Sequence, residues 1–573
     1  MYDGVCPSRR AQGNVSLFAI HLYCWRDIMA EALRQRAGNL KNELRKKTTV
    51  QGWVLPKQES SWAPPGTWTN IDLDITPLAR RTWTSLTILG YWVSDVISMQ
   101  SWETGSTILA LGLTWREAIF AIVFGSTVMA IPMSLNGYIG AVTHAPFPVL
   151  ARASFGYHFA KFPVVVRLIT CLFWHAITNF LAVAPTTQVI RAIWPSYRNV
   201  TNHIPESVGI TTQQMVSYFV IWTIQFPMLL IPPHKFRWLF AAKVVMTTAT
   251  VIGMVIWICL RAGGSGEIWQ QKPAVTGSEK SWLIMWALNS CTASWSTVGV
   301  NIADFTRYTK SGKTSLTTGA WFPLICSWIA IIGIVVTSAS GVVFGEYIWD
   351  PIAIIDTWEG PGGRAAAFFA GLSWCLAQLC VNISATVVSG ANDLTSLFPK
   401  YMNIRRGAIV LTLLGGWVMV PWKILHSAGS LLSFMNSLGV FLAPIMAIQV
   451  TDFFIVKRRA LDIPALYQPH GRYRYWYGIN WRALVAMLVS VTPQLPGLVN
   501  AVNPSLPIGG AVYISNMNWY FGLFSSGFVY SALSLAFPAQ ATSVSGMVET
   551  LEGIVEDGDR THEKEVSVKT EEL

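Results

Sequence analysis

Polar and aromatic side chains stand at helical spacing inside strongly apolar stretches of this chain. Trp174 and Thr178 lie four residues apart, so on a helix the indole and the hydroxyl share one face. Trp295 lies in the run SCTASWSTVG, whose small and hydroxylated residues permit a broken helix beside a cavity. Because indoles stack well on planar rings, the two Trp predict a site for an aromatic ligand. Packing between helices is the alternative.

A further polar face recurs later in the chain. Gln378, Asn382 and Thr386 follow at intervals of four residues, which places them on one face of an α-helix. Polar groups are costly in lipid, so this face must turn toward a bundle interior or a wet pathway. The pattern indicates either a ligand-binding face or hydrogen bonding between helices.

Two carboxylates, Asp95 and Glu103, stand eight residues apart in the first long apolar segment. An ionisable group inside a membrane span is a functional candidate because its charge is expensive to bury. We expect these two to be the candidates for ion coupling. A structural role, or a position near the membrane interface, is the alternative.

The composition defines the kind of protein that must position these residues. Of 573 residues, 52% are hydrophobic and 12% are charged, about half the share of ~25% found in soluble domains. This excludes an ordinary water-soluble enzyme. The 27 Trp, 44 Gly and 29 Pro are typical of a polytopic membrane protein. The net charge of +11 then reflects cytoplasmic loops, and no nucleic-acid partner is expected.

Twelve apolar segments predict an all-α polytopic membrane protein with twelve transmembrane helices. The segments lie near residues 86–110, 117–141, 163–190, 213–231, 239–261, 282–300, 319–345, 366–390, 407–421, 430–455, 482–497 and 516–537. The transmembrane domain is predicted to span 81–537, between a tail of residues 1–80 and an acidic tail of residues 538–573. Lys and Arg gather in the even-numbered loops, so these loops and both tails are predicted to be cytoplasmic.

No signature of an enzyme or a metal site stands out. The sequence has no Walker-type phosphate loop, HExxH, CxxC or GxSxG motif, and its eight Cys lack paired spacing. We expect no catalytic residue, no metal and no cofactor. A secondary transporter needs none of these. A channel or a membrane enzyme is a remote alternative.

Five blocks of sequence carry a likeness to a known family: Arg152–Trp174, Ile224–Lys243, Asn301–Lys310, Ala391–Gly407 and Tyr475–Ala483. In this order and spacing they resemble the nucleobase-cation symporters, in particular the fungal uracil, uridine and allantoin permeases. The resemblance covers about residues 68–537. It implies two inverted five-helix repeats in the first ten helices, a broken-helix sodium-symporter fold, and import of a nucleobase-like heterocycle across the plasma membrane by alternating access.

The resemblance also implies roles for residues already singled out. The family's third-helix Trp, which stacks on the substrate ring, matches Trp174, and the sixth-helix aromatic opposite it matches Trp295. A Gln is usual where this chain has Thr178. The eighth-helix Asn that reads substrate amides corresponds to Thr386, when the helix is aligned through Asn382. Because Thr hydroxyls are shorter and rotate freely, the related branch that carries thiamine and nicotinamide riboside is an alternative.

The coupling ion expected from this resemblance is the proton. Bacterial relatives of the hydantoin type hold sodium between carbonyls of the broken first helix and a small-Ser-Thr set on the eighth helix. The matching positions here are Ala377, Cys380 and Val381, so both hydroxyl ligands are missing. Protons need only a titratable group on a wet path, which Asp95 or Glu103 provides.

The expected partners are the heterocyclic substrate, protons and the lipid bilayer. The acidic tail also carries Lys564 and Lys569. In similar fungal permeases such tails recruit the ubiquitin and endocytosis machinery, and the resemblance implies the same partners here.

Overall fold

The computed structural model describes residues 50–56, 62–64, 70–229, 237–272, 274–425, 428–503 and 505–549. The chain divides into two compact units, residues 1–57 and 58–573. In the first unit the described residues form one 3-10 turn, η1 (Val50–Trp53). In the second unit nearly all regular structure is helical, and the described residues pair as β structure only at three isolated bridges.

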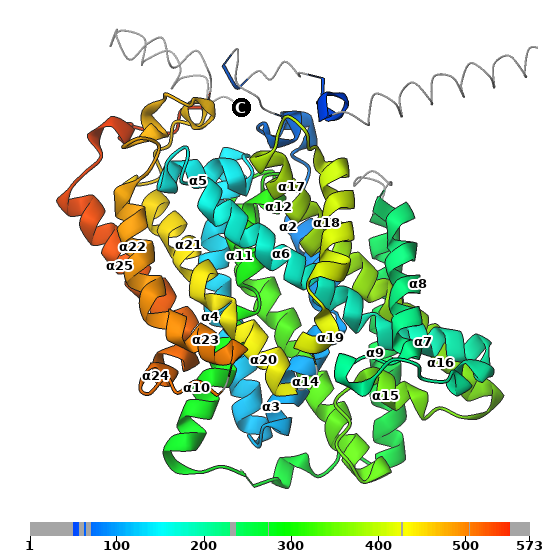
Figure 1. Ribbon diagram of the computed structural model, residues 1–573. Coiled ribbons are helices and arrows are strands. Elements are labelled where there is room, and N and C mark those ends of the chain that lie inside the picture. The colour runs from blue at the N-terminus through cyan, green and yellow to red at the C-terminus, as the bar shows by residue number, and fades with distance from the viewer. Residues whose placement is uncertain are drawn as a thin grey trace, which may run out of the picture. The chain divides into compact units, whose positions relative to one another are not determined.

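Helices occupy each of the twelve predicted apolar segments (Figure 1). In chain order they are α2 (Ser85–Val96) with α3 (Met99–Ala110), α4 (Trp115–Thr143), α6 (Lys161–Leu181) with α7 (Val183–Ile193), α8 (Thr212–Leu229), α9 (Arg237–Ala262), α10 (Gly277–Ala293) with α11 (Ser296–Asn301), α14 (Thr318–Phe344), α16 (Gly360–Val381) with η8 (Asn382–Val387) and α17 (Val388–Leu397), α18 (Ile404–Val418), α20 (Ala428–Ser437) with α21 (Gly439–Thr451), α22 (Trp481–Val491) and α25 (Asn518–Ala536). Shorter helices connect them: α5 (Phe147–Phe155), α12 (Ala303–Thr306), α13 (Gly312–Leu316), α15 (Pro351–Asp356), α19 (Pro421–Ile424), α23 (Leu495–Val502) and α24 (Ala511–Asn516).

Seven helices in the described part of the chain are long and apolar enough to cross a bilayer without interruption. They are Trp115–Thr143, Lys161–Ile193, Trp238–Ala262, Gly312–Phe344, Gly360–Leu397, Ser433–Val456 and Trp481–Val502. The prediction of an all-α, multi-pass membrane protein is therefore confirmed. The first and sixth segments fall outside this set because each is split into two shorter helices. The count of twelve crossings and the inverted repeats stay predictions.

The two splits occur where polar or small residues interrupt the apolar sequence. Between α2 and α3 the backbone of Ser98 is extended, and its side chain accepts the N–H of Ser101 as an N-cap. Between α10 and α11, Trp295 leaves the helical region with φ −95° and ψ 3°. The break that the composition of SCTASWSTVG permits is thus present.

A third irregularity lies in the eighth segment, which does not break. From Asn382 to Val387 its backbone forms a π-helical turn, η8, between α16 and α17. Such a turn closes i→i+5 hydrogen bonds, is rare in proteins, and is frequently found at functional sites where it occurs.

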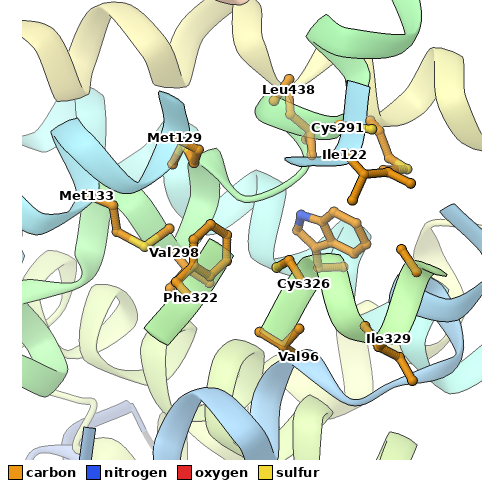
Figure 2. Packing of buried hydrophobic residues seen from close by; sticks show 14 of the residues in the cluster. Val96, Ile122, Met129, Met133, Cys291, Val298, Phe322, Cys326, Ile329 and Leu438 are labelled. Atoms are coloured by element: carbon orange, nitrogen blue, oxygen red, sulfur yellow. The ribbon is translucent and has the colours of Figure 1, made fainter. Parts of the chain in front are cut away.

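The helices around the two breaks share one hydrophobic core. The α14 helix packs on α3 and α4, and α4 also contacts α10 and α11. A Cβ on Gly333 would lie 2.4 Å from the Trp102 carbonyl oxygen, so only glycine allows α14 to approach α3 this closely. Figure 2 shows Phe322 of α14 packed among Val298 of α11 and Met133 of α4.

Other helices flank this core in two groups (Figure 1). The α21, α22 and α25 helices pack side by side, and the α16 helix packs against both α7 and α9. The α6 helix contacts α16, η8, α17 and α18. It therefore packs directly on the eighth and ninth segments.

The segments that precede the first helix and follow the last helix meet at one end of the bundle. The Tyr467 hydroxyl donates to the carbonyl of Leu73 at 2.8 Å, and the N–H of Val548 donates to the carbonyl of Leu461 at 2.9 Å. Tyr467 and Leu461 belong to the cation-rich loop between the tenth and eleventh segments. Both ends of the membrane domain thus lie at the same end of the helices, as an even number of crossings requires.

Candidate functional site

Trp174 lies on α6 with 7% of its surface exposed. Its ring meets Phe434 of α20 in a T-shaped contact, with the ring centroids 5.3 Å apart and the planes at 78°. The apolar run around it favours a helix whose interior face carries this indole. Phe434 therefore fixes the orientation of the ring from one side.

Trp295 stands at the start of α11, directly at the break. Its ring makes T-shaped contacts with Phe322 of α14 at 5.1 Å and with Trp92 of α2 at 6.2 Å. The Trp92 Nε1–H in turn donates to the Thr318 hydroxyl at 3.3 Å. The position of Trp295 is thus set by aromatic neighbours on the first and seventh segments.

The two indoles occupy one neighbourhood without touching. Their side chains belong to the same hydrophobic cluster, and α6 contacts α11. No ring contact joins Trp174 to Trp295 among the residues that the structure describes. A ligand held between the rings requires such a separation, and the sandwich itself stays a prediction.

Thr178 and Thr386 are both buried, on α6 and η8. Neither hydroxyl has a hydrogen-bond partner within the described ranges. A hydroxyl that no protein group engages can both donate to and accept from a ligand. These two therefore remain available for substrate binding.

Asn382 is placed differently from the two Thr. Its Oδ1 lies 3.0 Å from His175 Nδ1, and its Nδ2 donates to Asn179 Oδ1 at 3.1 Å and to Gln225 Oε1 at 3.3 Å. The amide is thus engaged by α6 and α8. Asn382 was predicted to bind substrate. Its amide is held by protein groups, so a role in substrate binding stays a proposal.

Gln378, on the same predicted face, faces the first helix break. Its Oε1 accepts the N–H of Met99, the first residue of α3, at 3.3 Å. The expectation that Gln378, Asn382 and Thr386 share one face assumes an α-helix throughout. From Asn382 onward the backbone is a wider, π-helical turn, in which residues four apart still lie close to one face, so the shared face of the three side chains stays a prediction.

Asp95 lies in a buried polar group that joins three segments. The Ser384 hydroxyl of η8 donates to Asp95 Oδ1 at 2.6 Å. The Lys243 ammonium of α9 is fully buried and interacts electrostatically with the Asp95 carboxylate. Asp95 Oδ2 and Lys243 Nζ have no hydrogen-bond partner in the described part of the chain. An acid and an amine thus face each other at a distance beyond direct pairing.

Lys243 was not singled out from the sequence. The signal was present, because a cation inside the apolar segment 239–261, away from its ends, is a functional candidate by the same reasoning that selected Asp95. Its partner could not be read from the chain, since the two residues are far apart in sequence.

Glu103 lies apart from Asp95, on the other side of the break at Ile97 and Ser98. It is buried, and its nearest interacting charge is Asp350, which caps α15. Both groups are acids, so Glu103 has like charge as its neighbour whereas Asp95 has an amine. The structure does not bring the two predicted carboxylates together.

A buried ion pair that sequence reasoning missed joins α6 to α17. Arg167 Nη2 pairs with Asp393, and both side chains are fully buried. Arg167 Nη2 also donates to the Ser389 carbonyl at 2.6 Å, while Asn301 Nδ2 of α11 donates to the Ser389 hydroxyl at 2.8 Å. The cluster ties the second half of the sixth segment to the third and eighth segments.

Comparison with known proteins agrees with this arrangement. The family described as permeases for cytosine/purines, uracil, thiamine and allantoin matches residues 75–522. An uncharacterised permease of Schizosaccharomyces pombe is 38% identical over 475 residues, which is 82% of this chain and 85% of that protein. The uracil permease and the allantoin permease of Saccharomyces cerevisiae are each 30% identical over 84% of this chain, covering 78% and 77% of those proteins.

Among solved structures, Mhp1, a nucleobase-cation-symport-1 family transporter in a closed conformation with bromovinylhydantoin bound, has a TM-score of 0.65. It is 22% identical and covers 82% of this chain and 97% of its own. At that identity the likeness shows the fold, which is that of a membrane transporter with broken helices. The matched family and the curated relatives together show that this chain belongs to the nucleobase-cation symporters and is a transporter, not an enzyme.

Proposed function

We propose that this protein imports a small planar nitrogen heterocycle of the uracil, uridine or allantoin class. The observation that carries the proposal is the placement of Trp174 and Trp295 on contacting elements at the break between α10 and α11. The similarity to uracil and allantoin permeases supports the same substrate class. A ring of this kind would stack on one indole and meet the other on its opposite face.

The hydroxyls of Thr178 and Thr386 complete the proposed site. A heterocycle with adjacent N–H and C=O groups offers both a donor and an acceptor at its edge, and each hydroxyl can serve either. Asn382 acts on substrate indirectly, by holding η8 in place. Because the chain has two Thr where the family resemblance implies amides, a thiamine-type or nicotinamide-riboside-type substrate is the second candidate.

Proton coupling through Asp95 is the second part of the proposal. Lys243 is close enough to interact electrostatically with Asp95 and with Cys380, a position where bacterial relatives supply a sodium ligand. A fixed ammonium already stands near this place, so an inorganic cation is not needed to balance the carboxylate. Protonation of Asp95 would weaken its attraction to Lys243 and so loosen the link between α2 and α9. Glu103 is the second candidate carrier.

The proposed location is the plasma membrane, with both tails in the cytosol. Support comes from the cation-rich loops, which gather at the end where the segments at Leu73 and Val548 dock. Residues 81–537 form the proposed transport domain, flanked by the tails 1–80 and 538–573. Ubiquitin and endocytosis factors are proposed partners of the tails.

The test measures the uptake of a radiolabelled heterocycle of the proposed class by yeast cells that lack endogenous permeases. Uracil, uridine and allantoin should compete, and Trp174→Ala should abolish saturable uptake at unchanged surface level. Trp328→Ala is the matched control, because Trp328 of α14 is 37% exposed and makes none of these contacts. Competition by thiamine or nicotinamide riboside alone would favour the second candidate. Saturable uptake of every ligand by Trp174→Ala would contradict the proposed site.

A further inference from the structure

Three side chains next to the proposed substrate site form a closed ring of hydrogen bonds. Asn179 Nδ2 lies 2.9 Å from His175 Nε2, His175 Nδ1 lies 3.0 Å from Asn382 Oδ1, and Asn382 Nδ2 donates to Asn179 Oδ1 at 3.1 Å. All three residues are at most 1% exposed. We call this set the amide–imidazole ring.

The direction of each hydrogen bond in the ring is determined. An amide nitrogen can only donate, so His175 Nε2 accepts from Asn179 and the proton is on Nδ1, which donates to Asn382. A doubly protonated imidazole would set an N–H of His175 against an N–H of Asn179. The ring therefore requires a neutral imidazole in one tautomer.

The ring determines how α6 is turned about its axis. His175 follows Trp174 directly, and Asn179 follows Thr178 directly, so the ring residues occupy the face next to the substrate face. Successive residues on an α-helix are about 100° apart, since a turn holds about 3.6 residues. Holding the one face against Asn382 therefore fixes the direction in which the indole and the hydroxyl point.

The same ring holds the other wall of the proposed site. Asn382 is the first residue of η8, the turn that also carries Ser384 and Thr386. Asn382 Nδ2 also donates to Gln225 Oε1 of α8 at 3.3 Å. The ring thus connects the substrate face of the third segment to the irregular turn of the eighth.

The fit around the imidazole leaves no room for adjustment. A Cβ added to Gly415 of α18 would lie 2.8 Å from His175 Cδ2 and 3.3 Å from its Cβ. Gly415 of α18 therefore lies close to the imidazole on one side, and amide groups hold both of its nitrogens. A change at either place must move the imidazole.

We propose that His175, Asn179 and Asn382 are positioning residues that set substrate specificity by fixing the relative rotation of α6 and η8. This inference rests on the proposed function of Trp174, Thr178 and Thr386. These positioning residues touch the binding residues' helices rather than the substrate. Disturbing them should change which heterocycle is preferred more than the maximal rate.

The experiment compares KM and Vmax for uracil and for allantoin in four variants expressed in permease-deficient cells. His175→Phe keeps a planar ring and removes both hydrogen bonds, so we expect KM to rise about tenfold for the preferred ligand and the KM ratio of the two ligands to change. His175→Gln can donate and accept at once, and should restore the wild-type ratio. Gly415→Ala keeps every polar group and displaces the imidazole, so it should reproduce the effect of His175→Phe. His203→Phe, at an exposed loop position, is the control.

The results separate this inference from the proposed function. An unchanged KM ratio in Gly415→Ala and His175→Phe, with uptake abolished by Trp174→Ala, would overturn the positioning role and leave the proposed site intact. A fall in Vmax alone, not rescued by His175→Gln, would also overturn it, because that pattern marks a structural role. If His175→Phe does not reach the membrane, the KM ratio of Gly415→Ala decides. Full uptake by Trp174→Ala would instead remove the proposed function on which the inference rests.

Discussion

The Ser384 hydroxyl donates to Asp95 Oδ1 at 2.6 Å and so joins the π-helical turn of the eighth segment to the first half-helix. The Cys380 carbonyl of the same helix lies 2.9 Å from Ser384 Oγ and is a competing acceptor for the one hydroxyl proton. The carboxylate is therefore reached by a hydroxyl from one side and by the field of Lys243 from another. A proton that binds Asp95 acts on the contacts of α2 with both α9 and η8.

The first prediction is that uptake depends on protons and not on sodium. Uptake should rise as the external pH falls from about 7 to about 5, because protonation loads Asp95, and it should collapse with a protonophore. Replacement of sodium by choline should have no effect. Sodium-dependent uptake that ignores pH would refute this coupling.

The second prediction concerns the acid and amine as a pair. Asp95→Asn should remove the acid stimulation of uptake and also lower the amount of folded protein, since it leaves the Lys243 ammonium buried alone. A buried charge that loses the opposite charge facing it is costly in a low-dielectric interior. The double variant Asp95→Asn/Lys243→Gln should regain surface expression but not acid stimulation. Glu103→Gln is the parallel test of the second carboxylate.

The third prediction ranks substitutions at the indole pair. Trp295→Phe should keep more uptake than Trp295→Ala, because a phenyl ring retains a stacking face and the contacts to Phe322 and Trp92. Stacking contributes about 0.5–1.5 kcal/mol beyond burial, so the loss at Ala should be at least severalfold in KM. Equal uptake by the two variants would assign Trp295 to packing.

The fourth prediction concerns the buried pair of Arg167 and Asp393. Arg167→Leu should strongly destabilise the protein, because it leaves the Asp393 carboxylate buried without its cation. The double variant Arg167→Leu/Asp393→Leu should recover most of the thermal stability measured on detergent-solubilised protein. If the single variant unfolds at the wild-type temperature, the pair contributes nothing to stability.

The fifth prediction concerns topology and the tails. A glycan acceptor engineered into residues 502–514 should be modified, and tags at either terminus should react only from the cytosol. Removal of residues after 549 should leave transport intact and slow removal from the cell surface. The cut must spare Val548, because its backbone bridges Leu461 and Ile463. Termini found on opposite faces would contradict an even number of crossings.

The sequence predicts the helices and one break well, for local reasons. Long apolar runs allow little except a helix in a bilayer, and the small residues around Trp295 remove the packing that would keep α10 and α11 continuous. The pairing of Trp174 with Thr178 on one face also follows from the spacing alone.

Contacts between distant segments could not be predicted in this way. Lys243 and Asp95 stand on different segments, as do Arg167 and Asp393, and nothing in the local pattern of either segment names its partner. The prediction of one face for Gln378, Asn382 and Thr386 stays a prediction. What local spacing could not predict is the wider, π-helical turn that the backbone forms from Asn382 to Val387.

The wide turn at Asn382–Val387 has a consequence for comparing this protein with its relatives. A relative whose eighth helix stays α-helical throughout spans the same height with one residue fewer. Its sequence then aligns with this one only if a single-residue gap is opened inside 382–387. Residues before Asn382 then keep one register and residues after Val387 keep another, so Ala377 and Asn392 would take their counterparts from opposite sides of that gap.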